Sequence, residues 1–180
     1  AVAQLKEEYR HITVSVISGS PMQVDNWLRD GSVEIGVTDR RWTGAELDWT
    51  KLVDDPFLAV LPPDSDAPDP MPADYLSGKA VIIPDYGTNT DTTRVFTRAG
   101  VEPAYTDDRL NNRSVLAAVA AGLGSTVFSR LELDYYAQQN LTVRAIDPPC
   151  LRELGVATLP HLRPLARKFL QCTAEMAEKL

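Results

Sequence analysis

The sequence predicts an α/β protein of two lobes, and three observations support this fold class. Runs of β-branched residues alternate with amphipathic helical segments along the whole chain, which is typical of α/β folds. The hydrophobic content is 44% of 180 residues, which is enough for substantial cores. Breaks at Asp54–Pro56 and Asp147–Pro149 interrupt the alternation. We therefore expect lobe I to comprise residues 1–54 and 150–180, and lobe II to comprise residues 55–149.

The first lobe begins with a helix, a strand, a helix and a strand. The first nine residues carry apolar side chains at helical spacing, and the β-branched run His11–Ile17 predicts a strand. Ser18–Pro21 ends this strand and opens the second helix, which Gly31 stops in the left-handed conformation. The next predicted strand is Val33–Val37. Two strands joined by a helix and short turns form a βαβ unit, which favours a parallel sheet.

The second lobe opens on the apolar run Phe57–Leu61, which predicts a strand buried on both faces. Residues 62–74 are rich in proline and aspartate, so we expect an exposed connection that is not part of any core. Ala80–Ile83 predicts another buried strand, and a helix follows it to Gly100. The remaining predicted elements are a helix over 111–122, a strand over 125–128, a helix over 131–139 and a strand over 141–146.

The chain then returns to the first lobe. A strand is predicted over 154–159, followed by a closing helix from Pro164. Apolar side chains recur every three or four residues along this helix, Cys172 among them, so they form one buried stripe.

The charge balance argues against several classes of partner. The chain has 18 Lys and Arg against 25 Asp and Glu, a net charge of −7, which disfavours binding to nucleic acid or acidic membranes. The sequence has neither the ~18 consecutive apolar residues of a membrane helix nor the apolar core of a signal peptide. We therefore expect a cytoplasmic protein with no membrane partner.

The sequence gives little support for catalysis or metal binding. Cys150 and Cys172 lack the spacing of a disulfide framework or a zinc site, which fits a reducing compartment. His11 and His161 stand alone, and the GxSxG, phosphate-loop and HExxH motifs are missing. We expect no enzyme activity, no catalytic residue, no metal site and no cofactor.

Polar residues follow the predicted strands at their carboxyl ends, where open parallel sheets bind ligands, and we expect them to face a cleft between the lobes. The candidate ligand-binding residues are Ser18, Gly19, Ser20, Thr38, Asp39, Tyr86, Gly87, Thr88, Asn89, Asn112, Arg113 and Phe128. Ordinary helix capping is an alternative role for Ser20, Thr88 and Asn112, and Thr38–Asp39 is alternatively a solvated loop. Hydroxyl and amide groups with Arg113 as the cation indicate a small polar or anionic ligand.

Five segments of the sequence together resemble the effector-binding domain of LysR-type transcriptional regulators. They are WLRDGSVEIGV at 27–37, DDPFLAVLPPDS at 54–65, the stretch from Gly78 to Gly87 with its strand and Pro-x-x-Gly, SVLAAVAAGLGSTVFS at 114–129 and DPPCLRELGVAT at 147–158. In this order and spacing they cover nearly the whole chain.

The resemblance implies a fold like that of type II periplasmic binding proteins, with two Rossmann-like lobes around a small-molecule effector. It also implies a homodimer or tetramer whose arrangement the effector changes, and so controls transcription. DNA would bind only through an N-terminal winged helix-turn-helix that is absent from this chain. The alternative is a free-standing solute-binding protein of the same fold that serves a transporter.

The sequence also departs from the family pattern. The chain starts in the helix that should follow the first strand of the effector domain, so that strand is missing. We expect the natural protein to be longer, and an intact mass of only 19.8 kDa for the native gene product would contradict this. Ser129 stands where the family usually has proline.

Overall fold

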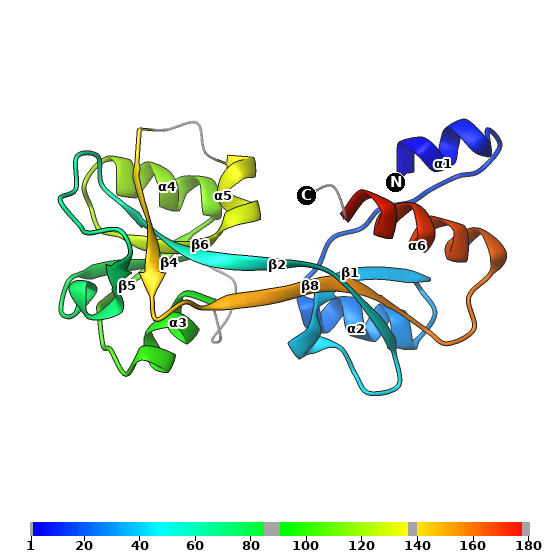
Figure 1. The fold of residues 1–180 in the computed structure, drawn as a ribbon, viewed down its shortest axis with the longest axis horizontal. Coiled ribbons are helices and arrows are strands. Elements are labelled where there is room, and N and C mark those ends of the chain that lie inside the picture. The colour runs from blue at the N-terminus through cyan, green and yellow to red at the C-terminus, as the bar shows by residue number, and fades with distance from the viewer. Residues whose placement is uncertain (1, 85–90, 137–139, 178–180) are drawn as a thin grey trace. The chain divides into compact units, whose positions relative to one another are not determined.

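The structure, a computed structural model, describes residues 2–84, 91–136 and 140–177 (Figure 1). The chain divides into two compact units. Unit 1 comprises residues 1–54 and 152–180, and unit 2 comprises residues 55–151. The chain passes from one unit to the other within two strands, β2 (Asp48–Leu61) and β8 (Leu151–Thr158).

Unit 1 has a short sheet in the order β1-β8-β2. Its elements besides β2 and β8 are α1 (Val2–Glu8), α2 (Pro21–Arg29), β1 (Ile35–Asp39), the 3-10 turn η1 (Arg40–Trp42) and α6 (Pro164–Ala177). β1 pairs with β8 in antiparallel register, with Ile35 opposite Thr158 and Asp39 opposite Leu154. The parallel pairing expected for this part of the chain is therefore wrong for β1.

Helix α2 packs closely on one face of this sheet. Gly36 lies so close to the helix that a Cβ there would stand 2.7 Å from Val24 Cγ1 and 2.9 Å from Leu28 Cδ1. Leu28 is fully buried and forms a cluster with Leu47 and Ala157. Gly31 follows the helix with a φ of 76°, the left-handed stop that the sequence predicted.

The predicted strand over His11–Ile17 is wrong. Residues 12–20 form no strand, and Val16 and Ile17 are 81% and 53% exposed. β-branched residues favour strands because they pack well on a half-buried sheet surface, and strand backbone needs a hydrogen-bonded partner. The described part of the chain supplies neither to this segment, so the βαβ unit expected in the first lobe does not form.

Helices α1 and α6 pack against each other (Figure 1). Leu5 of α1 is buried, as are Ala166 and Cys172 of α6, and Lys168 Nζ lies 3.6 Å from Glu8 Oε2. Cys172 is thus buried as the sequence predicted, whereas Leu165 of the same helix is exposed, so the predicted stripe is buried only in part. Among the described helices, none is long and apolar enough to cross a membrane.

Unit 2 contains strands of mixed direction with helices between them. Its elements besides β2 are β3 (Met71–Pro72), the 3-10 turn η2 (Ala73–Leu76), β4 (Ala80–Pro84), α3 (Asp91–Ala99), β5 (Ala104–Leu110), α4 (Asn112–Ala120), β6 (Thr126–Ser129), α5 (Arg130–Tyr136) and β7 (Thr142–Asp147). β4 pairs with β5 in parallel, and β2 pairs antiparallel with β6 and β7. β5 was not predicted, because its polar sequence AYTDDRL lacks a strand's apolar pattern.

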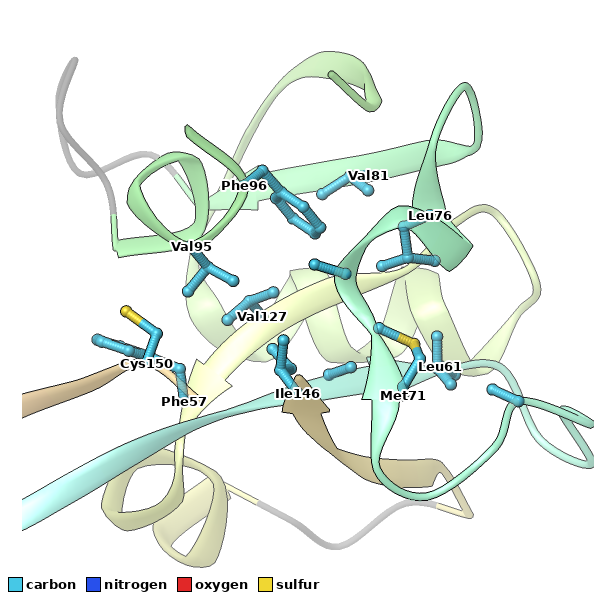
Figure 2. Close-up of a cluster of buried hydrophobic side chains, with 13 residues drawn as sticks. Phe57, Leu61, Met71, Leu76, Val81, Val95, Phe96, Val127, Ile146 and Cys150 are labelled. Atoms are coloured by element: carbon cyan, nitrogen blue, oxygen red, sulfur yellow. The ribbon is translucent and has the colours of Figure 1, made fainter. Parts of the chain in front are cut away.

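Two hydrophobic clusters lie on opposite sides of the strands of unit 2. Phe57, Ala59 and Leu61 of β2 belong to one cluster, with residues of α3, whereas Leu58 and Val60 belong to the other, with residues of α4 and α5. Figure 2 shows side chains of the first cluster. Successive side chains of a strand point to opposite faces, so this division follows from the strand period. The prediction that Phe57–Leu61 is buried on both faces is confirmed.

The stretch 62–74 belongs in part to the core, so its prediction as a wholly exposed connection is wrong. Ala67, Met71 and Ala73 are buried in the first cluster, where Met71 is visible near Leu61 (Figure 2). Arg144 Nε donates a hydrogen bond to the Ala67 carbonyl at 2.9 Å. The few apolar side chains of this polar stretch are thus held against the sheet by packing and by hydrogen bonds from β7.

Candidate functional site

Thr38 lies near the carboxyl end of β1 in unit 1. Its side chain is buried, and its Oγ1 has no hydrogen-bond partner among the residues that the structure describes. Leaving a buried polar group unpaired costs about 1–3 kcal/mol, so most such groups in folded proteins have a partner. The alternative of a solvated loop is wrong for Thr38, because the strand holds its hydroxyl in the interior.

Asp39 ends β1, and its buried carboxylate is committed to Arg41. It accepts hydrogen bonds from Arg41 N at 2.9 Å, from Nε at 2.9 Å and from Nη2 at 2.5 Å. The guanidinium balances the charge of the carboxylate, and the bond to Arg41 N caps the turn η1. Asp39 therefore stabilises η1, the turn that follows β1.

Trp49 of β2 carries another buried polar atom. Its indole Nε1 has no hydrogen-bond partner within the described parts of the chain. The guanidinium carbon of Arg40 lies 5.5 Å from the centre of the Trp49 ring, a cation–π contact. The sequence did not predict a role for Trp49, because nothing in its spacing connects it with Thr38; sheet pairing brings the two strands into one unit.

The turn Ser18–Ser20 builds the start of α2. Ser20 Oγ accepts a hydrogen bond from Gln23 N at 3.3 Å, and Gln23 Oε1 accepts one from Ser20 N at 2.8 Å, which is a capping box. A Cβ at Gly19 would stand 2.6 Å from the Trp27 ring. The capping role considered for Ser20 is therefore confirmed, and the side chain of Ser18 remains exposed.

The candidates Tyr86, Gly87, Thr88 and Asn89 lie outside the described residues. The helix that follows them, α3, positions Arg94, which the sequence did not predict as a site residue. Arg94 Nη2 lies 3.4 Å from Cys150 Sγ and donates a hydrogen bond to the Leu151 carbonyl. Its guanidinium carbon is 5.3 Å from the centre of the Phe57 ring. These partners come from distant parts of the sequence, so no local pattern reveals the contact.

Asn112 is the first residue of α4 in unit 2, and its side chain is buried. The capping account proposed for Asn112 is wrong, because Asn111 is the N-cap and its Oδ1 accepts from Ser114 N at 3.0 Å. Oδ1 of Asn112 has no hydrogen-bond partner in the described segments. Arg113 is exposed. This helix start thus presents a buried amide oxygen and, one residue later, an exposed cation.

Phe128 and Ser129 lie at the end of β6. Phe128 is buried in the second hydrophobic cluster with Leu58 and Val60, so its side chain contributes to packing. Ser129 Oγ donates a hydrogen bond to Glu132 Oε2 at 3.1 Å, which joins the strand end to the first turn of α5.

Groups typical of metal or redox sites are scattered in the described residues. Within them, no three or more His, Cys, Asp or Glu side chains form a group able to hold a metal ion. His11 and His161 are exposed. Cys150 and Cys172 are buried free thiols.

The sequence matches the family model of the LysR substrate binding domain over residues 1–178. The chain belongs to this family. A comparison of the sequence with curated proteins found no match. The prediction of a LysR-type effector-binding domain is thus confirmed at the level of the family, and it is favoured over the free-standing solute-binding alternative.

Solved structures of LysR-family regulatory domains have the same fold. The structure is similar to the CcmR regulatory domain of Synechocystis PCC6803, with a TM-score of 0.85, 21% identity, and coverage of 99% of this chain and 90% of that one. The C-terminal domain of a probable LysR family regulator from Rhodococcus sp. RHA1 has a TM-score of 0.81, 18% identity and coverage of 96% and 89%. A full-length BenM mutant has a TM-score of 0.84, 14% identity and coverage of 99% and 62%. The predicted type II periplasmic-binding-like α/β fold is confirmed.

Proposed function

We propose that this LysR substrate binding domain senses a small polar or anionic effector and performs no catalysis. The observation that carries this proposal is the buried Oγ1 of Thr38 near the end of β1, which has no hydrogen-bond partner among the described residues. The buried Oδ1 of Asn112 at the start of α4, for which the described segments also supply no partner, supports it. Effector binding satisfies polar atoms that are otherwise costly to bury, and this gain is available as binding free energy.

We further propose that the chain works as part of a longer, cytoplasmic protein that forms a homodimer or tetramer. DNA is contacted through an N-terminal winged helix-turn-helix, and not through this acidic chain of net charge −7. The full-length BenM mutant, of which this chain covers 62%, supports a longer architecture. The division of the chain into lobe I, residues 1–54 and 150–180, and lobe II, residues 55–149, is also part of this proposal.

A thermal-shift screen tests the proposal. The panel contains carboxylates and phosphates, among them 2-PG, with which the CcmR regulatory domain was solved; amines and apolar compounds serve as controls. A ligand at 100 times its dissociation constant adds about 2.7 kcal/mol to the folded state, which gives a clear rise in melting temperature. We expect at least one anionic compound to give a saturable rise. A response to amines or apolar compounds alone contradicts an anionic effector, and no response at all contradicts effector sensing.

A further inference from the structure

Unit 1 contains two buried polar atoms on strands that flank the same central strand. Thr38 Oγ1 and Trp49 Nε1 are each buried and without a hydrogen-bond partner in the described ranges. Their strands, β1 and β2, flank the same central strand, β8. β8 pairs with β1 and is also in contact with Trp49 of β2. These two relations show on which face of the sheet the side chains of Thr38 and Trp49 lie.

Gly155 of β8 links the two side chains. It lies opposite Thr38 in the antiparallel pairing of β1 and β8, and residues opposite each other point to the same face. A Cβ at Gly155 would stand 2.5 Å from Cζ2 of Trp49 and closer still to Cε2, the ring carbon bonded to Nε1. The Cε2–Cζ2 side of the indole, next to Nε1, therefore lies over Gly155, on the face that carries the side chain of Thr38.

The packing of α2 identifies this face independently. Gly36 precedes Thr38 by two residues and is in contact with Leu28 of α2. Ala157 follows Gly155 by two residues and belongs to the cluster of Leu28, against which Trp49 also packs. Because every second residue of a strand shares a face, Thr38 and Trp49 lie on the α2 side of the sheet.

The chemistry of these groups selects the bound atom. An indole N–H only donates hydrogen bonds, and a threonine hydroxyl donates as well as accepts. The Arg40 guanidinium over the Trp49 ring adds a positive charge nearby, and the neighbouring Asp39 carboxylate is already balanced by Arg41. Two donors beside a cation favour an oxygen that accepts hydrogen bonds and carries negative charge.

We propose that Thr38 Oγ1 and Trp49 Nε1 together bind one oxygen of a carboxylate or phosphate group of the effector. The proposal rests on the function proposed above and names the anchoring group of the effector. Gly155 is part of this subsite, because any side chain there would occupy the space of the indole edge. The proposal makes Trp49 of β2 a binding residue, although it is not among the candidates selected at the ends of the predicted strands.

Tryptophan fluorescence tests the subsite directly. The chain has three tryptophans, so the double variant Trp27→Phe/Trp42→Phe leaves Trp49 as the single reporter. This variant is titrated with 2-PG, inorganic phosphate and succinate. We expect a saturable change in Trp49 emission with at least one of these anions. Thr38→Val in the same background keeps the side-chain volume, removes the hydroxyl and weakens that affinity about tenfold.

Matched variants separate a lost hydrogen bond from a general disturbance. Thr50→Val changes an exposed threonine next to Trp49 and is expected to leave the affinity unchanged. In the chain that otherwise keeps its tryptophans, Trp49→Phe removes the N–H group and is expected to weaken binding about tenfold, as measured by calorimetry. If Trp49→Phe does not fold, Thr38→Val alone decides the question.

Three outcomes overturn the subsite. The first is an unchanged Trp49 emission with all three anions. The second is that Thr38→Val binds a compound that raises the melting temperature of the wild-type chain with unchanged affinity. This result would contradict the subsite but would still support effector sensing. The third is that both Thr38→Val and Trp49→Phe lower the stability of the ligand-free protein but leave the affinity unchanged. In that case the two atoms bind a structural water and not the effector.

Discussion

Asp25 of α2 shows how one residue ties a helix to a distant loop. Its carboxylate accepts hydrogen bonds from Arg29 Nε at 2.6 Å and from Gly44 N at 3.0 Å. Burial acts to raise the pKa of this carboxyl, but the bonds from Arg29 and Gly44 and the charge of Arg29 hold the pKa below its usual value. A pKa lowered by folding stabilises the protein above the unfolded value, and this stabilisation disappears as pH falls through the folded value.

We predict that Asp25→Asn destabilises the protein by about 1 kcal/mol near neutral pH. The difference from wild type is expected to shrink as the pH is lowered from about 5 to about 2, because the wild-type carboxylate becomes protonated. Urea unfolding over this pH range measures both effects, with the exposed Asp48→Asn as control. Equal pH dependence in wild type and Asp25→Asn would show that the carboxylate does not contribute as described.

At the residue scale, position along the strands and helices was enough to find some site residues. Thr38 and Asn112 were selected because they follow or begin predicted elements, and each carries a buried polar atom that has no hydrogen-bond partner within the described part of the chain. The roles of Trp49 and Arg94 depend on Gly155, Cys150 and other residues far away in sequence, so local pattern does not find them. Such contacts are decided by sheet pairing and helix packing.

At the element scale, the contact of α2 with β1 fixes the layer in which Thr38 lies. We predict that Gly36→Ala destabilises the protein by about 1–3 kcal/mol, because the new methyl group meets Val24 and Leu28 at under 3 Å. The next residue of the same strand supplies a matched control, since Val37 is 59% exposed and Val37→Ala is expected to have little effect. Thermal unfolding of both variants measures the difference, and equal melting temperatures would contradict the close packing.

Elements with a clear period were predicted, and those that depend on distant partners were not. The apolar run Phe57–Leu61 and the helix that begins at Asn112 stand out in the sequence because they bury apolar faces. His11–Ile17 has strand-like residues but no partner strand in the described structure, whereas the polar β5 forms a strand because β4 pairs with it. Strand formation is thus decided by pairing as much as by residue type.

At the scale of the whole molecule, the alternation of elements and the order of the family segments were sufficient to predict the fold class. The family match over residues 1–178 spans both units. A regulatory domain needs only a modest energetic preference, because a coupling of about 1–3 kcal/mol changes the response several-fold to about a hundredfold. Satisfying one or two unpaired polar atoms supplies free energy of this size.

Hydrogen–deuterium exchange with and without the best compound of the thermal-shift screen tests the central claim most directly. If the effector is bound by Thr38 and Trp49, exchange slows at the end of β1 and in η1, over residues 36–42. Thr38→Val is expected to reduce the protection of residues 36–42. Unchanged exchange over residues 36–42 in wild type at saturating compound would contradict the account.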